Sequence, residues 1–160
     1  SSEIECDSYI CNTLDDEHFE RLFPALTIYK NKLGGTAAVF AGSPDCEFHI
    51  SQAFSFLNYS RKEQLIKLLS KMNALPAYYP NDEEVYLKVA KNGDELLCAV
   101  FNIGLDPIEK LEMVFEKSPT KIERLCSNGQ RETVKFEIQD GKVVTDIPCN
   151  TLDPVIIFVK

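Results

Sequence analysis

The sequence predicts an α+β N-terminal segment followed by an all-β antiparallel sandwich. A clear helical pattern occurs in the first half alone, whereas the second half alternates between apolar and polar residues in one short run after another. Asn-Gly and Asp-Gly turns separate those runs at the spacing typical of a β-sandwich. A chain of 160 residues is long enough for two small domains, and we place them at residues 1–80 and 83–160.

The N-terminal stretch from Glu3 to Asn12 alternates in polarity and predicts a strand. Its expected inward positions are Ile4, Cys6, Ser8 and Ile10, and its expected outward positions are Glu5, Asp7 and Tyr9. The acidic cluster that follows, together with residues 18–23, predicts a short turn or the start of a helix. Pro24 should end that element, because the residue before a proline is pushed out of the helical conformation.

Two further strands are predicted at Leu26–Tyr29 and Thr36–Ala41, joined by a bend over residues 31–35. The glycine pair in that bend supplies the positive φ angles that a hairpin demands. Residues 42–45, Gly-Ser-Pro-Asp, read as another turn.

The clearest local signal is a capping box, in which Ser60 and Glu63 bond each other's backbone amides at a helix start. The apolar positions that follow at helical spacing are Leu65, Ile66, Leu68, Leu69 and Met72. We therefore predict a helix over residues 61–73. Ala74–Asp82 contains two prolines and no periodicity, so we interpret it as a linker between the domains.

The second half contains the predicted sandwich strands. Val85, Leu87 and Val89 alternate with polar residues, and Asn92-Gly93 turns the chain into the apolar run from Glu95 to Asn102. Later strands are predicted at Leu111–Phe115, Lys121–Leu125, Thr133–Ile138, Lys142–Ile147 and Val155–Val159. We expect Leu97, Val100 and Phe101 to be largely buried and Phe136 to join the core.

Two similar segments, Asn102-Ile-Gly-Leu-Asp-Pro107 and Asn150-Thr-Leu-Asp-Pro154, share an Asn followed by Leu-Asp-Pro. Asp before Pro favours an extended backbone that enters a turn. We interpret the similarity as two structural corners rather than as a repeated binding site.

The composition argues against several classes of function. A net charge of −8 with scattered basic residues disfavours nucleic acid, which needs clustered Lys and Arg. No apolar run approaches the length of a membrane-spanning helix. The six cysteines form no C-x-x-C pair, so we expect no metal site and no cofactor, and we expect mostly buried free thiols.

Catalytic constellations are not evident in the sequence. Glycoside hydrolysis needs two opposed carboxylates, and the acidic pairs Asp15-Asp16 and Glu83-Glu84 would point to opposite faces of a strand. Cys46 lies three residues before His49, which leaves a hypothesis of a small thiol-dependent enzyme, although a half-buried loop cysteine is the simpler interpretation.

Carbohydrate binding is the functional hypothesis that the residues themselves support. Sandwich domains bind sugars by stacking aromatic rings on pyranose faces, and the candidate ligand-binding residues are Tyr78, Tyr79 and Tyr86. The chain has no Trp, the strongest stacking residue. Ordinary packing between domains is the alternative role of these tyrosines, because Tyr suits half-buried interfaces.

Three stretches resemble a known family. They are residues 22–27 with 31–39, residues 56–65, and the run from Ala99 to Pro107 with Leu152–Val155. Each is similar to the region behind the catalytic barrel in some bacterial β-galactosidase-like glycoside hydrolases. The resemblance implies a non-catalytic accessory region that packs on or helps assemble the catalytic barrel of its parent chain. No catalytic position of that family has a counterpart here.

The resemblance and the N-terminus together shape the remaining expectations. The first residues, Ser-Ser-Glu, include no initiator Met and no signal-peptide pattern, so we expect an expressed fragment or a processed segment. The compartment stays open at this point, with the cytoplasm slightly favoured. Besides the catalytic barrel, the candidate partners are a carbohydrate and a second copy of the chain in a homo-oligomer.

Overall fold

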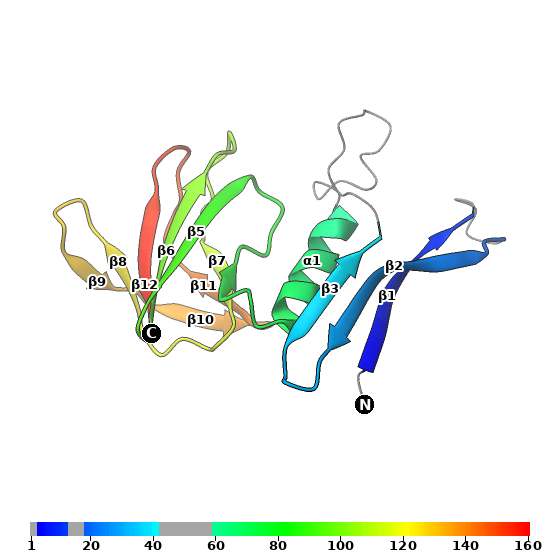
Figure 1. Cartoon of the computed structure of the whole chain (residues 1–160). Coiled ribbons are helices and arrows are strands. Elements are labelled where there is room, and N and C mark those ends of the chain that lie inside the picture. The colour runs from blue at the N-terminus through cyan, green and yellow to red at the C-terminus, as the bar shows by residue number, and fades with distance from the viewer. Residues whose placement is uncertain (1–2, 13–17, 42–58) are drawn as a thin grey trace. The chain divides into compact units, whose positions relative to one another are not determined.

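The structure is a computed structural model, and it describes residues 3–12, 18–41 and 59–160. The chain divides into two compact units, the N-terminal unit Ser1–Met72 and the C-terminal unit Asn73–Lys160. Both consist mainly of antiparallel sheet, and a short helix belongs to the first (Figure 1). The predicted fold class, an α+β segment followed by an antiparallel sandwich, is confirmed.

The N-terminal unit is a three-stranded sheet with a helix on one face. Its strands β1 (Glu3–Cys11), β2 (Arg21–Lys30) and β3 (Thr36–Phe40) pair in that order, and the helix α1 spans Tyr59–Lys71. Leu26 and Ile28 of β2 are buried together with Leu68 of α1. Ala38, Phe40 and Met72 pack around them, so the apolar stripe of the helix and one face of the sheet form this unit's core.

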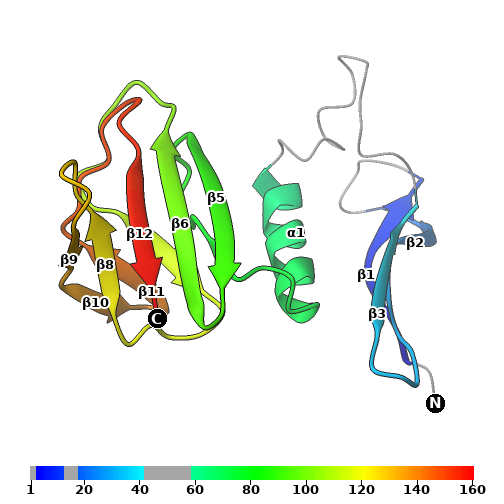
Figure 2. The ribbon, with the colours of Figure 1, turned by 60° about the vertical axis from the view of Figure 1, so that its left-hand side comes forward.

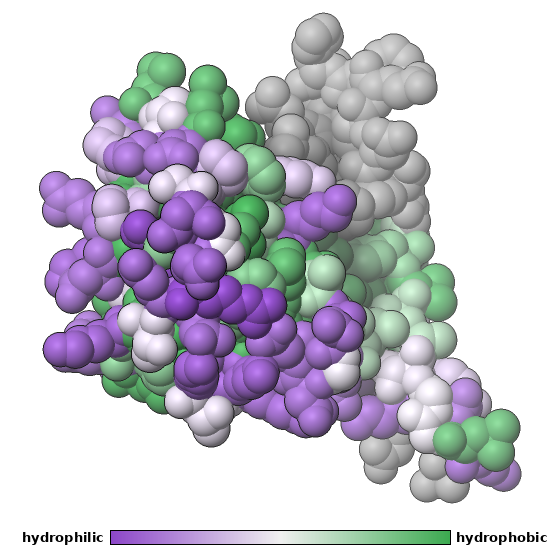
Figure 3. All heavy atoms as spheres, turned by 90° about the vertical axis from the view of Figure 1, so that its left-hand side faces the viewer, coloured by the Kyte–Doolittle hydropathy of each residue, from purple (hydrophilic) through white to green (hydrophobic). Residues whose placement is uncertain are grey.

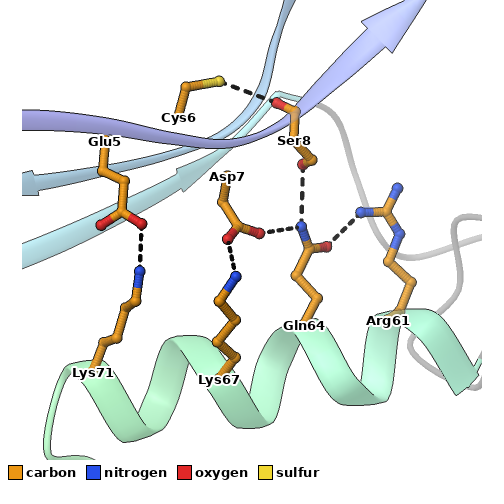
Figure 4. Close-up of polar contacts among 8 residues, drawn as sticks. All are labelled: Glu5, Cys6, Asp7, Ser8, Arg61, Gln64, Lys67 and Lys71. Atoms are coloured by element: carbon orange, nitrogen blue, oxygen red, sulfur yellow. Dashed lines mark hydrogen bonds and ion pairs between the residues drawn. The ribbon is translucent and has the colours of Figure 1, made fainter.

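The predicted orientation of β1 was wrong in part. Tyr9 is 42% exposed as expected, and Ser8 faces α1, where its hydroxyl accepts a 3.1 Å bond from Gln64 Nε2. Glu5 and Asp7, expected to face outward, point toward α1 (Figure 4), although the Glu5 side chain is still 55% exposed. The Lys71 ammonium pairs with Glu5, and the Lys67 Nζ lies 2.9 Å from Asp7 Oδ1. Ile4, expected inside, is 71% exposed. The cause is α1, which presents amide and ammonium groups as well as apolar ones to the sheet, so the strand's acidic residues face the helix.

Pro24 does not end an element, because β2 runs through it from Arg21 to Lys30. Pro24 pairs with Tyr9 where the β1–β2 register is irregular, and β3 pairs only with Leu26–Lys30. The proline's missing N–H therefore removes no bond to β3, as is typical of prolines at bulges and sheet edges.

The helix α1 is shifted toward the N-terminus relative to its predicted bounds. It begins at Tyr59, so Ser60 lies in the first turn and is not the N-cap. It ends at Lys71, and Asn73 takes a φ of 51°, the left-handed conformation that commonly stops a helix. Residues 42–45, for which the sequence predicts a turn, lie outside the described residues.

The C-terminal unit is a sandwich of two antiparallel sheets (Figure 2). One sheet has the order β5-β6-β12-β8-β9, and the other has the order β10-β11-β7-β4. The strands are β4 (Ala77–Tyr78), β5 (Val85–Asn92), β6 (Glu95–Asn102), β7 (Glu112–Phe115), β8 (Ile122–Leu125), β9 (Arg131–Thr133), β10 (Phe136–Gln139), β11 (Lys142–Thr145) and β12 (Val155–Val159). Gly93 at φ 61° makes the β5–β6 turn, as the Asn-Gly pair predicts.

The core lies between the two sheets. Cys98, Val100 and Ile157 of the five-stranded sheet are at most 1% exposed. Met113 and Val143 of the four-stranded sheet face them in the same cluster of buried residues. Alternate residues of each strand fill this layer, which is the arrangement that sheet-on-sheet packing requires.

The segment expected to be a linker is part of this core. Ala77 and Tyr79 are 3% and 8% exposed, and β4 pairs with β7 at the edge of the four-stranded sheet. The two prolines that suggested a linker flank this short strand and leave its two residues free to pair.

The strand predicted at Thr133–Ile138 is broken in the structure. Its first part is β9 in the five-stranded sheet, and its second part is β10 in the four-stranded sheet. Val134 donates a backbone hydrogen bond to Ile122 at the crossing. The chain switches sheets there, so Val134 lies outside β10, while Phe136 and Ile138 still share a face of that strand. Phe136 is partly buried against the core as expected, and Ile138 is 54% exposed.

Candidate functional site

The outer face of the five-stranded sheet carries apolar side chains. Along β6, Val100 faces the core at 0% exposure, and Leu97 and Phe101 are half-buried on the opposite face. The predicted burial is confirmed for Val100, whereas Leu97 and Phe101 are only partly buried, because successive residues of a strand point to opposite sides of its sheet. Register also places the charged residues Lys88, Glu95 and Glu123 on this face. Its larger apolar members and Ala99, which together we call the outer apolar face, are Tyr86, Leu97, Ala99, Phe101, Ile156 and Phe158.

An aromatic pair lies on the outer apolar face. Tyr86 of β5 is directly opposite Phe101 of β6, their ring centroids are 5.9 Å apart, and the ring planes are tilted by 52°. Tyr86 is 58% exposed, so one of its ring surfaces remains open to solvent. Such a tilted pair is a favourable aromatic arrangement, and it fixes the direction in which Tyr86 points.

Charged residues close one end of the same face. The Arg131 guanidinium lies 3.3 Å from the centre of the Phe158 ring, and its Nη1 is 3.1 Å from Glu95 Oε1. Glu95 also pairs with Lys160 at 3.6 Å. The Lys121 ammonium, 2.8 Å from Glu123, holds the pKa of that carboxyl below its usual range. Arg131 thereby combines a cation–π contact with an ion pair over the apolar surface.

The three predicted tyrosines do not form one surface. Tyr79 is 8% exposed, and its hydroxyl donates a 2.9 Å hydrogen bond to Glu83. Burial, and after it the bond to Glu83, raises the pKa of Tyr79. Tyr78 belongs to the four-stranded sheet and Tyr86 to the five-stranded sheet. Tyr86 is thus the one of the three with a largely exposed ring, and its partner is Phe101.

Phe101 was not recognised as a surface residue, although the sequence contains the necessary signal. A two-residue turn at Gly93-Asp94 sets Asn92 opposite Glu95. Counting back from that pair sets Tyr86 opposite Phe101. Hairpin register therefore predicts the aromatic pair once the turn type is known.

Three of the described thiols, Cys98, Cys126 and Cys149, lie in environments that favour the protonated form. Burial raises the pKa of the Cys98 thiol to about 11. Burial also raises the pKa of Cys149, and a hydrogen bond with Glu132 raises that of Cys126. A neutral thiol is a poor nucleophile. Cys46 and His49, the residues of the thiol-enzyme hypothesis, lie outside the described residues.

A shallow groove of about 590 Å³ lies beside β10 and β11. Val134, Phe136 and Val144 form its apolar lining. Lys110 and Asp146 at its border pair at 3.4 Å, and both side chains are largely exposed. The groove presents charges of both signs, without a preference for anions or cations.

The described residues contain neither a metal-binding cluster nor a membrane-spanning helix. Within residues 3–12, 18–41 and 59–160, no three His, Cys, Asp or Glu side chains are grouped so that they could hold a metal ion. In the same ranges no helix has the length and apolar character needed to cross a membrane. The comparisons with known proteins give no further constraint, because no family, curated protein or solved structure matches the chain.

Proposed function

We propose that the chain is a non-catalytic accessory region of a larger carbohydrate-active protein of the β-galactosidase-like glycoside hydrolase class. Its sandwich packs on the catalytic barrel of that protein or helps to assemble it. The observation that carries the proposal is the outer apolar face, where Leu97, Phe101 and Ile156 lie on the outside of a finished sandwich. A second protein layer over such a sheet face removes apolar area from water, which is the driving force of domain packing.

The ionisable groups support an accessory role. Around the outer apolar face, Glu95 and Glu123 take part in ion pairs with Arg131, Lys160 and Lys121. Each of these carboxylates pairs with a neighbouring cation on the sheet surface. Glycoside hydrolysis instead needs two carboxylates that face each other across a bound sugar.

The test uses the protein at its full encoded length and a variant that lacks residues 1–160. Both are assayed on chromogenic galactosides. We expect the intact protein to hydrolyse them and the truncated one to be less active or poorly assembled, because the reactive groups lie elsewhere while the sandwich supports them. An intact protein without any glycosidase activity, or one whose activity is independent of this region, would contradict the proposal.

Carbohydrate binding is a second candidate function, and the exposure of Tyr86 favours it. Tyr86 is 58% exposed and is held by Phe101, which leaves one ring surface for stacking on a sugar. Aromatic faces are the common platform for such contacts.

Calorimetric titration of the chain with galactose and galacto-oligosaccharides tests this candidate. Binding that disappears in Tyr86→Ala would support it. Tyr29→Ala is the matched control, because Tyr29 is an exposed tyrosine, 39% accessible, of the N-terminal unit. Equal heats for Tyr86→Ala and the unmodified chain would rule out the role of Tyr86.

A further inference from the structure

The two corners that share Leu-Asp-Pro lie together at one end of the sandwich. They follow β6 and precede β12, and a parallel bridge joins Asn102 to Thr151. We call residues 102–107 and 150–154 the double corner. Leu105 and Leu152, the equivalent leucines of the two segments, are 94% and 79% exposed, and Ile103 is 54% exposed. Figure 3 shows apolar residues gathered at the upper end of a largely hydrophilic surface, the end where these loops meet in Figure 2.

A buried side chain holds the double corner in place. Asn102 is 0% exposed, and its Nδ2 donates to the carbonyl oxygens of Asp106, at 2.8 Å, and Cys149, at 3.0 Å. Its Oδ1 accepts a 3.0 Å bond from the Gly104 amide. One amide group therefore binds both loops from the inside, which restricts their backbone conformations.

A second set of bonds ties the two loops directly to each other. The Thr151 hydroxyl lies 3.1 Å from the Gly104 carbonyl oxygen and 3.2 Å from that of Leu105. The Leu152 amide donates a 3.0 Å bond to the Asn102 carbonyl. The loops that bear the exposed leucines are therefore held by hydrogen bonds to each other. Because they are already ordered, little conformational entropy is lost when a partner binds.

Leu152 has a backbone conformation that leucine rarely adopts. Its φ is 59°, in the left-handed region where a branched side chain crowds its own backbone. A glycine would relieve that strain, but it would remove the exposed side chain. Strained residues of this kind concentrate at functional positions.

The surroundings of the three apolar side chains are acidic. Asp106 follows Leu105, Asp153 follows Leu152, and all of these residues are exposed. The Ile103 amide binds the carbonyl of Glu84, another exposed acid, which brings that residue to the same place. Neither loop of the double corner contains Lys, Arg or His. The surface is therefore an apolar tip with a negative border.

We propose that the double corner is a docking knob that inserts into an apolar pocket rimmed by Lys and Arg on a partner protein. Apolar side chains held rigidly in water gain from burial in such a pocket. The acidic border selects a basic rim by charge complementarity. An anionic membrane carries the wrong charge for this tip. The inference goes beyond the proposed function, because it fixes the docking surface whatever the partner does.

The experiment is site-specific photo-cross-linking in the protein's own cells, at its full encoded length. A benzophenone amino acid replaces Leu105 in one protein and Ile138 in the control. Ile138 is an equally suitable site, since it is an exposed apolar residue, 54% accessible, on β10 and outside the double corner. Both replaced side chains are exposed, so neither replacement opens the core. The attachment points are mapped by mass spectrometry of the cross-linked peptides.

The result expected is a dominant adduct from position 105 to an apolar segment of a folded protein domain with Lys or Arg at its border. The double substitution Asp106→Lys and Asp153→Lys should lower that adduct by roughly tenfold, the factor that about 1.4 kcal/mol of binding free energy gives. Unchanged thermal melting of that variant would show that its fold is intact.

Several results would overturn the inference. They are an adduct at position 105 no stronger than at position 138, attachment to lipid, attachment to residues 1–72 of the same chain, or attachment that charge reversal leaves intact. The proposed function is tested separately. Attachment to a basic-rimmed pocket on a protein unrelated to carbohydrate chemistry would support the docking knob and contradict the accessory role.

Discussion

At the scale of single residues, Asn102 is the polar group on which most local structure depends. Its side chain is fully buried and bonds three backbone groups of two loops. We expect Asn102→Ala to lower the free energy of unfolding by about 3 kcal/mol, because each backbone group left without a partner in the interior costs roughly 1–3 kcal/mol.

Urea denaturation followed by circular dichroism measures that loss. Asn128→Ala is the matched control, since Asn128 accepts a single bond from the Gln130 amide at an exposed turn. Its expected cost is below about 1 kcal/mol. Equal losses in the two variants would show that the buried hydrogen bonds of Asn102 contribute no more to stability than a single exposed one.

Cys98 gives a pH-dependent prediction at the same scale. Burial raises the pKa of its thiol from 9.0 to about 11, so the folded chain binds a proton between pH 9 and 11 that the unfolded chain has released. Stability is therefore unaffected by this group below pH 9 and falls as the pH rises, by about 2 kcal/mol at pH 11. The unmodified chain and Cys98→Ala should show a difference in stability that shrinks over this interval. A difference that stays constant with pH would contradict the assignment.

Asp7 acts in the opposite direction. Hydrogen bonds from Gln64 and Lys67 hold the pKa of its carboxyl below the usual value of 3.8. The folded state therefore favours the charged form, and the resulting stability is present above pH 4 and lost as the pH falls below it. An acid titration of the N-terminal unit's circular dichroism should show a weaker loss of structure in Asp7→Asn than in the unmodified chain. An identical acid transition would contradict the prediction.

At the scale of elements, the contact between α1 and its sheet combines buried apolar side chains with a row of ion pairs and side-chain hydrogen bonds to β1. Leu68 is 5% exposed and packs on Leu26 and Ile28. We expect Leu68→Ala to cost about 2–4 kcal/mol through lost transfer free energy and a cavity. Lys71→Ala removes a partly exposed ion pair and should cost less than about 1 kcal/mol. Thermal melts of both variants make the comparison, and a larger loss for Lys71→Ala would reverse this ranking.

Most elements could be predicted from local patterns, because hairpin turns and hydrophobic periodicity act over a few residues. The chain turns near both predicted sites. Asp140 and Gly141 both have positive φ angles, whereas the first turn is formed by Gly93 and Asp94, with a positive φ at Gly93. The errors concern long-range partners. The direction of Glu5 and Asp7 depends on lysines of α1, such as Lys67, which bonds Asp7 from 60 residues further along the chain. No pattern within β1 reveals these distant partners.

The site was less predictable than the fold. The sequence identifies Tyr86 as a candidate, but it also suggests Tyr79, whose burial is a consequence of β4 joining the sheet edge. The similarity of the two Leu-Asp-Pro segments is visible in the sequence, but it predicts only two structural corners. Their adjacency, which makes a surface out of Leu105 and Leu152, arises only when β6 and β12 pair side by side.

At the scale of the whole molecule, the C-terminal unit has the features of a structural scaffold. The C-terminal unit is a two-layer sandwich with one core, an outer apolar face and a cross-tied double corner. Each of these features suits contact with another protein surface. Under the proposed function, the parent protein would supply the reacting groups and this region would supply support.

The most direct measurement of that claim is turnover of chromogenic galactosides by the 160-residue chain on its own. The account predicts a rate equal to that of buffer. Hydrolysis well above background that vanishes when a single Asp or Glu of this chain is replaced by its amide would contradict it.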